Sequence, residues 1–384
     1  MKSPKGFLFN GINSGIKRKD NDLAVIICEP YAHAVGFFTS NEFQAESLLV
    51  TKKHILNDKI AAIVVNSGCA NCALGKRGMN SALKICKKCA DELGVDEEEI
   101  LICSTGTIGV PLPDKKIISS VKKLISGALP EKSMDFAKAI MTTDKFPKHE
   151  SIKLKNGVSI LGIAKGAGMI EPNLATTLCF LLTDAKIKKT SFKKIVKQIL
   201  EVTFNRISVD ADESTNDTLL AISNAASGVN VEESKEYLDE FTKGVFSVLS
   251  RLSYQIVKNG EGATKVVKIT VKRSKSKAIA EKIARKLASS MLFKTSIYGN
   301  RANWGRIISS IGSLKLGVGK SLDVYYGSTK VVNNGVSMYN NKKQADVYLK
   351  KNKEVEVIID LKKGSLKFWI YTTDLSPQYV EMNK

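Results

Sequence analysis

The sequence predicts a layered α+β or α/β sandwich, and three observations favour this fold class. The chain has 384 residues, 43% hydrophobic and 25% charged, which is typical of globular proteins and excludes a mainly disordered or collagen-like chain. Short β-branched runs predict strands and amphipathic stretches predict helices. The two are mixed without a regular βαβ alternation, which disfavours a doubly wound sheet. The length fits two or three lobes, or one large α/β unit.

Four apolar, β-branched runs in the first third predict strands. These runs are Leu23 to Cys28, Val35 to Thr39, Ala61 to Asn66 and Ile100 to Cys103. The C-terminal third predicts strands again, and Asn334-Gly335 lies between two apolar segments there. Because Asn-Gly favours the tight turn of a two-residue hairpin, we expect a hairpin at this position.

Three amphipathic stretches predict helices, at residues 80–93, 233–257 and 277–290. In the first, apolar side chains recur on one face at helical spacing: Ala82, Ile85, Cys86, Cys89 and Leu93. In the third, Glu281 and Arg285 stand four residues apart, so their side chains can pair on the helix surface.

Two central stretches fit neither a helix nor a strand. Residues 164–177 contain two glycines, a proline and an asparagine between apolar runs, which indicates a shaped loop. Residues 203–218 are rich in hydrogen-bonding side chains and have no helical or strand period. We expect the second stretch to be a hydrogen-bonded structural loop.

The charge balance is strongly basic, with 59 Lys and Arg against 38 Asp and Glu and a net charge of +21. Such an excess favours anionic partners, among them nucleic acid, membrane surfaces and small acidic metabolites. A generally Lys-rich composition gives the same number, so charge alone does not choose among them. The basic clusters lack interleaved aromatic residues, which disfavours a platform for stacking single-stranded nucleic acid.

Cysteine usage and hydropathy predict a soluble, cytoplasmic protein with reduced thiols. Seven cysteines are an odd number in a long chain, which disfavours a disulfide framework. The first 36 residues contain no apolar stretch long enough for a signal peptide. No apolar run reaches the 18 or so residues that a membrane-spanning helix needs.

The cysteine pairs Cys69-x-x-Cys72 and Cys86-x-x-Cys89 raise the alternative of a structural zinc site. Their separation is slightly short for a zinc ribbon, and Cys86 and Cys89 lie on the apolar face of a predicted helix. Free cysteine is commonly a small buried apolar residue. We therefore expect buried thiols and no metal, and keep a basic zinc-binding or nucleic-acid-binding protein as the alternative class.

An N-terminal nucleophile is a catalytic chemistry that needs few histidines, and one loop of this sequence fits its pattern, as many loops would. The chain has only three histidines, no Ser or Cys in a Gly-x-Ser-x-Gly elbow and no P-loop. An α-amine has a pKa of about 7.7–8.0, so it can act as a base toward a hydroxyl on its own residue. Thr176 follows a loop and precedes a predicted strand. Cleavage before Thr176 would create such a nucleophile.

Several long motifs, in a characteristic order, resemble the ArgJ family of glutamate N-acetyltransferases, also called ornithine acetyltransferases, of arginine biosynthesis. The resemblance extends over nearly the whole chain. The motifs are Asn66 to Gly68 with Ala70-Asn71, Ser104 to Gly109 with Leu112-Pro113, Met141 to Asp144 with Pro147-Lys148, Lys165 to Thr176, Phe204 to Asp210, Ser214 to Thr218, Gly260 to Lys265, and Tyr298 to Asn300 with Ala302 to Arg306.

The resemblance implies a fold, a processing event and a reaction. It implies an ArgJ/DmpA-like α/β sandwich similar to N-terminal-nucleophile hydrolases, with its own topology. It implies self-cleavage between Ala175 and Thr176, giving an alpha chain of residues 1–175 and a beta chain of residues 176–384. The fragments would stay together and assemble as a heterotetramer of two alpha and two beta chains. Thr176 would pass acetyl from N-acetylornithine to glutamate without a cofactor.

The resemblance also implies roles for matched positions. Thr105 and Gly106 correspond to the oxyanion hole. The small residues of this expected turn would let the negative oxygen of the tetrahedral intermediate approach the backbone closely. The substrate-binding positions are Thr142, Lys165, Thr176, Glu261 and Asn383. The charge of Lys165 suits a substrate carboxylate, and that of Glu261 suits an ammonium group.

Two departures and one open choice accompany the resemblance. The family usually continues beyond the asparagine that Asn383 matches, and Cys69 and Cys72 replace residues that are usually not cysteine. The sequence does not distinguish members that also use acetyl-CoA as donor from those that do not. An N-terminal-nucleophile amidohydrolase or aminopeptidase of similar fold is the nearer alternative. It would release the acyl group to water.

Overall fold

The computed structural model describes residues 3–171 and 177–384. The chain forms two compact units. Apart from the residues that are not described, the first comprises residues 1–166, 172–205 and 213–256, and the second comprises residues 167–171, 206–212 and 257–384. None of the helices in the described part of the chain has the length and apolar character of a membrane span.

The first unit contains an eight-stranded sheet in the order β4-β3-β2-β8-β7-β6-β5, with β1 also paired to β2. Its strands are β1 (Phe7–Ile12), β2 (Leu23–Phe38), β3 (Ile60–Cys69), β4 (Ile100–Thr107), β5 (Lys148–Lys153), β6 (Ser159–Lys165), β7 (Leu178–Thr183) and β8 (Thr218–Ser223). Its helices are α1 (Glu46–His54), α2 (Lys76–Leu93), α3 (Asp114–Ser126), α4 (Ser133–Ala139), α5 (Lys189–Leu200) and α6 (Lys235–Lys258).

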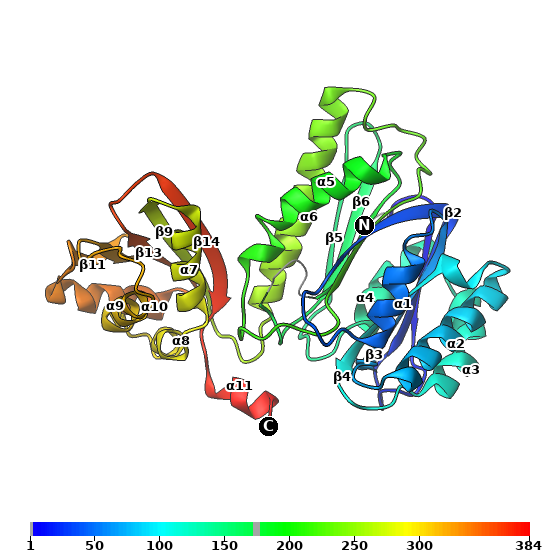
Figure 1. Ribbon diagram of the computed structural model, residues 1–384, viewed down its shortest axis with the longest axis horizontal. Coiled ribbons are helices and arrows are strands. Elements are labelled where there is room, and N and C mark those ends of the chain that lie inside the picture. Colours follow the sequence, from blue (N-terminus) through cyan, green and yellow to red (C-terminus); the bar gives the residue numbers. More distant parts are fainter. Residues whose placement is uncertain (1–2, 172–176) are drawn as a thin grey trace. The chain divides into compact units, whose positions relative to one another are not determined.

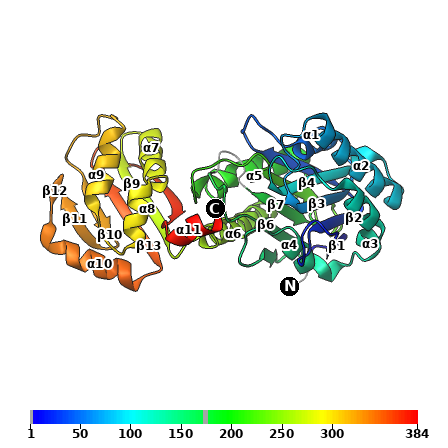
Figure 2. The ribbon, with the colours of Figure 1, turned by 90° about the horizontal axis from the view of Figure 1, so that it is seen from below.

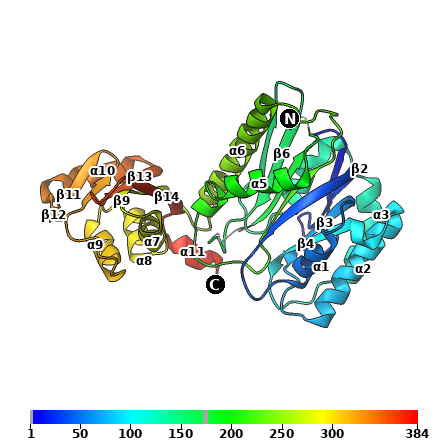
Figure 3. The same cartoon turned by 45° about the horizontal axis from the view of Figure 1, so that its top comes forward.

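Strand β2 joins the two halves of this sheet (Figure 3). Its first part pairs with β1 and β3, and its residues 33–38 pair with β8. The sequence predicts two separate strands here, and this is wrong: one strand runs through the exposed stretch from Glu29 to Tyr31 and changes partner there. Polar and proline residues interrupted the apolar pattern because this stretch faces solvent, although the backbone continues as a strand.

The two halves of the sheet enclose one apolar core, which confirms the layered sandwich. Alternate residues of β2, β3 and β4 pack in the same cluster as alternate residues of β6, β7 and β8, for example Ile63, Leu101, Phe180 and Leu220. The opposite side of β2–β4 packs against α2 and α3. Helix α6 covers β6, where Val248 and Leu252 occupy the space beside Gly162. Figure 1 shows α5 and α6 beside β5 and β6, and α1–α3 beside β3 and β4.

The second unit is a six-stranded sheet with one layer of helices (Figure 2). The strand order is β12-β11-β10-β13-β9-β14. The strands are β9 (Val266–Ser274), β10 (Asp323–Tyr326), β11 (Thr329–Asn333), β12 (Val336–Ser337), β13 (Glu354–Asp360) and β14 (Leu366–Thr373). The helices are α7 (Lys277–Ala288), α8 (Met291–Tyr298), α9 (Trp304–Ser313), α10 (Lys342–Lys351) and α11 (Pro377–Met382).

The local predictions for helices and the hairpin are confirmed. Helices α2, α6 and α7 occupy the three predicted amphipathic stretches, with boundaries that differ by at most four residues. Strands β11 and β12 form the antiparallel hairpin, and Asn334 and Gly335 have φ of +49° and +77°. Both central turn residues therefore adopt the positive φ that the Asn-Gly signal predicts.

Candidate functional site

Thr105 and Gly106 lie in the last residues of β4, where the backbone approaches β3 very closely. Thr105 pairs with Ser67 and Gly106 with Gly68, so these residues extend the strand and do not form the turn expected from sequence. Gly106 has φ of +135°, and a Cβ there would stand 2.3 Å from the carbonyl carbon of Gly68. Only glycine fits this position.

Lys165 contacts Thr105 across the two halves of the sandwich. Lys165 ends β6, and its Nζ donates a hydrogen bond to Thr105 Oγ1 at 2.9 Å. The loop before β8 reinforces this junction, because Asn216 Nδ2 donates to the carbonyl oxygens of Ala70 and Ser104 at 2.7 and 2.8 Å. Two of the positions that the sequence assigns to the site thus meet, although 60 residues separate them.

A buried carboxylate, Asp144, connects Thr142 to the end of β6. Its Oδ2 accepts the backbone N–H of Thr142 at 3.0 Å, and its Oδ1 accepts that of Gly166 at 2.8 Å. Lys148, whose side chain is fully buried, forms an ion pair with Asp144. Burial by itself raises the pKa of Asp144, but the charges of Lys148 and Lys165 and the hydrogen bonds to the carboxylate outweigh it and lower this pKa to about 2.

Residue-level reasoning from the sequence missed Asp144 and Lys148, as well as two other charged residues near Lys165. Lys17 Nζ donates to the Met141 carbonyl oxygen at 2.6 Å. Asp217 is 3% exposed, and its Oδ2 has no hydrogen-bond partner among the described residues. Burial raises the pKa of Asp217 well above its ordinary value, and Lys165 opposes this only in part. Asp144, Lys148 and Asp217 lie inside the motifs that carry the family resemblance, and those motifs were the signal that could have identified them. Lys17 lies outside them.

Replacing Asp144 by asparagine is expected to lower the free energy of unfolding by about 3–5 kcal/mol, because Lys148 would keep a buried charge without its counter-ion. Urea unfolding measures this change. The double variant Asp144→Asn/Lys148→Met removes both charges and is expected to recover most of the loss. An unchanged unfolding free energy in the single variant would contradict the role of the ion pair.

The same ion pair gives the stability a defined pH dependence. The pKa of Asp144 is lowered from 3.8 to about 2, so the folded state favours the charged carboxylate. The corresponding stabilisation is present above pH 3.8 and is lost as the pH falls towards 2. Unfolding of the wild type should therefore become easier over this range, whereas Asp144→Asn should lose less stability there.

The expected cleavage site, Ala175 and Thr176, lies outside the described residues. The next residue, Thr177, is described and is 4% exposed. Its carbonyl oxygen accepts the N–H of Thr218 at 2.9 Å. Leu178 then pairs with Lys165 on one side and Thr218 on the other. The chain that follows Thr176 therefore enters the sheet beside Lys165.

Glu261 and Asn383 meet in the second unit. Asn383 Nδ2 donates to Glu261 Oε2 at 2.9 Å, and the Glu261 N–H donates to the Ala167 carbonyl oxygen at 2.9 Å. Glu261 also lines a pocket of about 330 Å³ together with Asp210, Lys294 and other residues. The two predicted substrate-binding positions of this unit are thus in direct contact.

The four cysteines of the zinc alternative are buried thiols. Cys69 ends β3 and donates to the Val110 carbonyl oxygen at 3.1 Å, whereas Cys86 and Cys89 lie on the buried face of α2. Burial raises the pKa of Cys89 to about 12. Across residues 3–171 and 177–384, no group of three or more His, Cys, Asp or Glu side chains could hold a metal ion. These findings give the zinc alternative no support.

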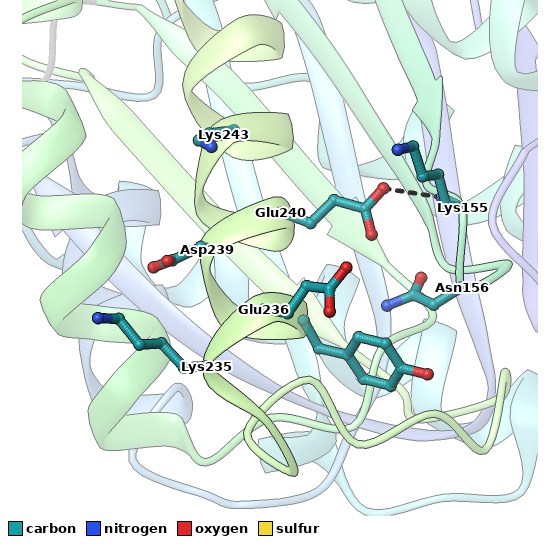
Figure 4. Close-up of a pocket in the computed structure, with 8 residues that line it drawn as sticks. Lys155, Asn156, Lys235, Glu236, Asp239, Glu240 and Lys243 are labelled. Carbon is teal, nitrogen blue, oxygen red and sulfur yellow. Dashed lines mark hydrogen bonds between the residues drawn. The ribbon is translucent and has the colours of Figure 1, made fainter.

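A second pocket lies at the turn between β5 and β6 and at the start of α6 (Figure 4). Its side chains are mostly exposed and carry both signs of charge, and Glu240 accepts the backbone N–H of Lys155 at 2.9 Å. None of the residues predicted for the site lines this pocket. It is a mixed, solvated surface and does not compete with the site near Lys165.

Comparison with known proteins gives consistent similarities. The model of the ArgJ family matches residues 8–384. The arginine biosynthesis bifunctional protein ArgJ of Caldanaerobacter subterraneus subsp. tengcongensis is 38% identical, over 100% of this chain and 97% of that protein. A glutamate N-acetyltransferase of Methanocaldococcus jannaschii is also 38% identical, with the same coverage. The crystal structure of ornithine acetyltransferase complexed with ornithine from Mycobacterium tuberculosis is 32% identical, covers 45% of this chain and 96% of that chain, and has a TM-score of 0.44.

Proposed function

The chain belongs to the ArgJ family, and on this basis we propose that it is an acetyltransferase that moves the acetyl group of N-acetylornithine to glutamate. The observation that carries the proposal is the junction of Lys165 with Thr105 at 2.9 Å, beside the glycine-only position Gly106 and the strand that follows Thr176. This junction brings together the backbone of Thr105, the charge of Lys165 and the strand that begins two residues after the expected nucleophile, Thr176.

We propose that maturation begins with an acyl shift at the Ala175–Thr176 bond. The Thr176 hydroxyl oxygen attacks the Ala175 carbonyl carbon, the hydroxyl proton passes to the amide nitrogen, and the C–N bond breaks. Water then hydrolyses the resulting ester, which leaves a carboxylate on Ala175 and a free α-amine and hydroxyl on Thr176. The α-amine can then serve as the base for its own hydroxyl.

Acetyl transfer would follow in two balanced steps. The Thr176 oxygen attacks the acetyl carbonyl carbon of N-acetylornithine, its proton passes through the α-amine to the departing nitrogen, and ornithine leaves. The amine of glutamate then attacks the acetyl ester, and the proton returns to the Thr176 oxygen. In both steps Thr105 and Gly106 would stabilise the negative oxygen, as oxyanion-hole donors do. No cofactor enters this scheme.

Charge supports the assignment of substrate groups. We assign substrate-binding roles to Thr142, Lys165, Thr176, Glu261 and Asn383. Both substrates carry carboxylate and ammonium groups, so a cation such as Lys165 and an anion such as Glu261 complement them. The Asn383 amide already donates to Glu261 and would orient its carboxylate. Asp144 would hold Thr142 and the end of β6 in place.

Strand pairing explains how two fragments would remain one enzyme. Strand β6 of the expected alpha chain pairs with β7 of the expected beta chain along six residues, from Ile160 with Thr183 to Lys165 with Leu178. Strand β2 pairs with β8 in the same way. Cleavage would therefore leave the shared sheet intact. By family resemblance, we infer a cytoplasmic heterotetramer of two alpha and two beta chains.

The test is acetyl transfer by the purified protein from N-acetylornithine to isotopically labelled glutamate, followed by mass spectrometry. Labelled N-acetylglutamate and stoichiometric ornithine are expected. Release of acetate without labelled product would instead indicate a hydrolase of the aminopeptidase type. Parallel reactions with acetyl-CoA determine whether it is a second donor, because the relatives carry both the bifunctional and the glutamate N-acetyltransferase names.

A further inference from the structure

A buried carboxylate, Asp22, fixes the loop that joins β1 to β2 in the first unit. Asp22 is 0% exposed, and its Oδ1 accepts the backbone N–H and the hydroxyl of Ser14, both at 2.7 Å. Its Oδ2 accepts the backbone N–H groups of Ile16 and Lys17, both at 2.8 Å. Such charge-assisted hydrogen bonds are among the strong ones. The Asp22 carbonyl oxygen also accepts the N–H of Ser67 at 2.8 Å, so the loop is held against β3.

The side chain of Lys17 lies over the close approach of β3 to β4. A Cβ added to Gly68 would stand 3.5 Å from Lys17 Cγ and 3.9 Å from its Cε, so the aliphatic part of the lysine covers this glycine. Gly68 is the residue that pairs with Gly106. At the other end of the side chain, Nζ donates to the carbonyl oxygen of Met141 at 2.6 Å, and Thr142 is the next residue. Lys17 is therefore next to two of the positions expected to form the site.

A second cation, Lys165, lies near Lys17. Its Nζ donates to Thr105 Oγ1 at 2.9 Å, and the residue after Thr105 pairs with the glycine that Lys17 covers. Burial lowers the pKa of Lys17 against the opposing charges of Asp22 and Asp20. The charge of Lys165 lowers this pKa further, because nearby like charges disfavour each other's charged form. An anionic ligand beside both ammonium groups would relieve this repulsion.

Lys17 also has a donor left for such a ligand. An ammonium group carries three N–H donors. In the part of the chain that the structure describes, Lys17 Nζ donates to two neutral carbonyl oxygens, at 2.6 and 3.2 Å. Lys17, Thr142 and Lys165 are all partly exposed. Solvent therefore has access to both cations and to the threonine beside them.

The two substrates of the proposed reaction differ in the number of their carboxylates. N-acetylornithine has one carboxylate and a side-chain ammonium group, whereas glutamate has two carboxylates. Lys165 complements the carboxylate that both substrates share, which leaves the second carboxylate of glutamate without a cation. We propose that Lys17 is a specificity-determining residue that binds the side-chain carboxylate of glutamate. This role rests on the proposed function. Lys17 would repel the side-chain ammonium of ornithine, which favours the exchange of ornithine for glutamate.

The test uses the purified, self-processed enzyme, with rates counted per free Thr176 α-amine. In a ping-pong reaction kcat/KM for the donor reports the first half-reaction, and kcat/KM for the acceptor reports the second. Lys17→Met keeps an aliphatic side chain over Gly68 but removes the charge. We expect kcat/KM for glutamate to fall about 10- to 100-fold, as for the loss of one hydrogen bond to a charged group. The value for N-acetylornithine should stay within about twofold of the wild type.

Glutamine as acceptor gives a readout that a purely structural role would not change. It resembles glutamate in size but lacks the side-chain charge, so the wild type is expected to prefer glutamate. Lys17→Met should lower this preference about 10-fold or more, and Lys17→Arg, which keeps the charge, should retain most of it. Lys19→Met is the matched control. It removes an exposed cation from the same loop and should leave both rates and the preference unchanged.

An unchanged preference for glutamate over glutamine in Lys17→Met would overturn the inference. Equal losses of kcat/KM for N-acetylornithine and glutamate would also overturn it, because they would indicate binding of the shared carboxylate or general support of the fold. If Lys17→Met does not fold, Lys17→Gln gives the same comparison, since its amide also lacks the charge but can still donate a hydrogen bond. A wild type that transfers no acetyl to glutamate would instead overturn the proposed function itself.

Discussion

The variant Thr176→Ala is expected to remain one uncut chain of 41.9 kDa and to lose acetyl transfer by about 10⁴-fold or more. Alanine lacks the hydroxyl that performs both the acyl shift and the transfer, so one substitution should abolish both events. The wild type should instead give two co-purifying fragments of about 19 and about 23 kDa, in proportion to residues 1–175 and 176–384. Denatured intact mass of fresh protein measures the difference.

Thr177→Ala is the matched control for this variant. It removes the same hydroxyl from the adjacent residue, and Thr177 Oγ1 is buried without a hydrogen-bond partner among the described residues. This variant should therefore cleave and transfer acetyl close to the wild-type level. Fragments of unchanged mass from Thr176→Ala, or an uncut yet active wild type, would show that another group performs the chemistry.

Gly106→Ala is expected to impair both folding and catalysis severely. The new Cβ would lie 2.3 Å from the Gly68 carbonyl carbon and 2.5 Å from the Cys69 nitrogen, at a φ of +135°. The nearest atoms are all backbone atoms of Gly68 and Cys69, so no flexible side chain could move away. We expect a loss of about 4 kcal/mol or more in unfolding free energy. Any folded fraction should show a kcat lowered about 10²- to 10³-fold through a displaced oxyanion-hole donor.

Gly109→Ala is the control that separates the steric clash expected at Gly106 from the strain of a positive φ. Gly109 is three residues further along the chain and also has positive φ, at +77°, but a Cβ added there would meet no atom within 4 Å. It should cost only the backbone strain of about 1–2 kcal/mol. Chemical unfolding and kcat measurements on both variants give the comparison. Equal losses in the two variants would mean that the approach of β4 to β3 imposes no steric requirement at Gly106.

The pattern of apolar residues predicted much of the secondary structure. The faces of α2, α6 and α7 follow the helical period, and the turn at Asn334-Gly335 follows from backbone preferences of two residues. Such signals are local, because they depend on neighbours within one or two turns of chain. Where the local pattern was broken by exposed residues, from Glu29 to Tyr31, the prediction split one strand in two.

The partners of the charged residues were not predictable in this way. Motif resemblance identified Thr105, Lys165 and Glu261, but not that Lys165 donates to Thr105 or that Asn383 donates to Glu261. The ion pair of Asp144 with Lys148 has helical i,i+4 spacing, yet the residues between them form no helix. Its burial arises from packing against Gly166 and the end of β6, which no local pattern encodes.

Apolar patterning was enough to predict the fold class, and motif resemblance was enough to identify the family and to name the residues expected to react. Which groups meet depended on the folded chain: Asp144 with Thr142 and Gly166, and Asp210 with Met169 and Ile170. Asp210 stands some 40 residues from the two backbone N–H groups that donate hydrogen bonds to it. Hydrogen bonds form only at contact distance, and the crossing of distant segments sets that distance.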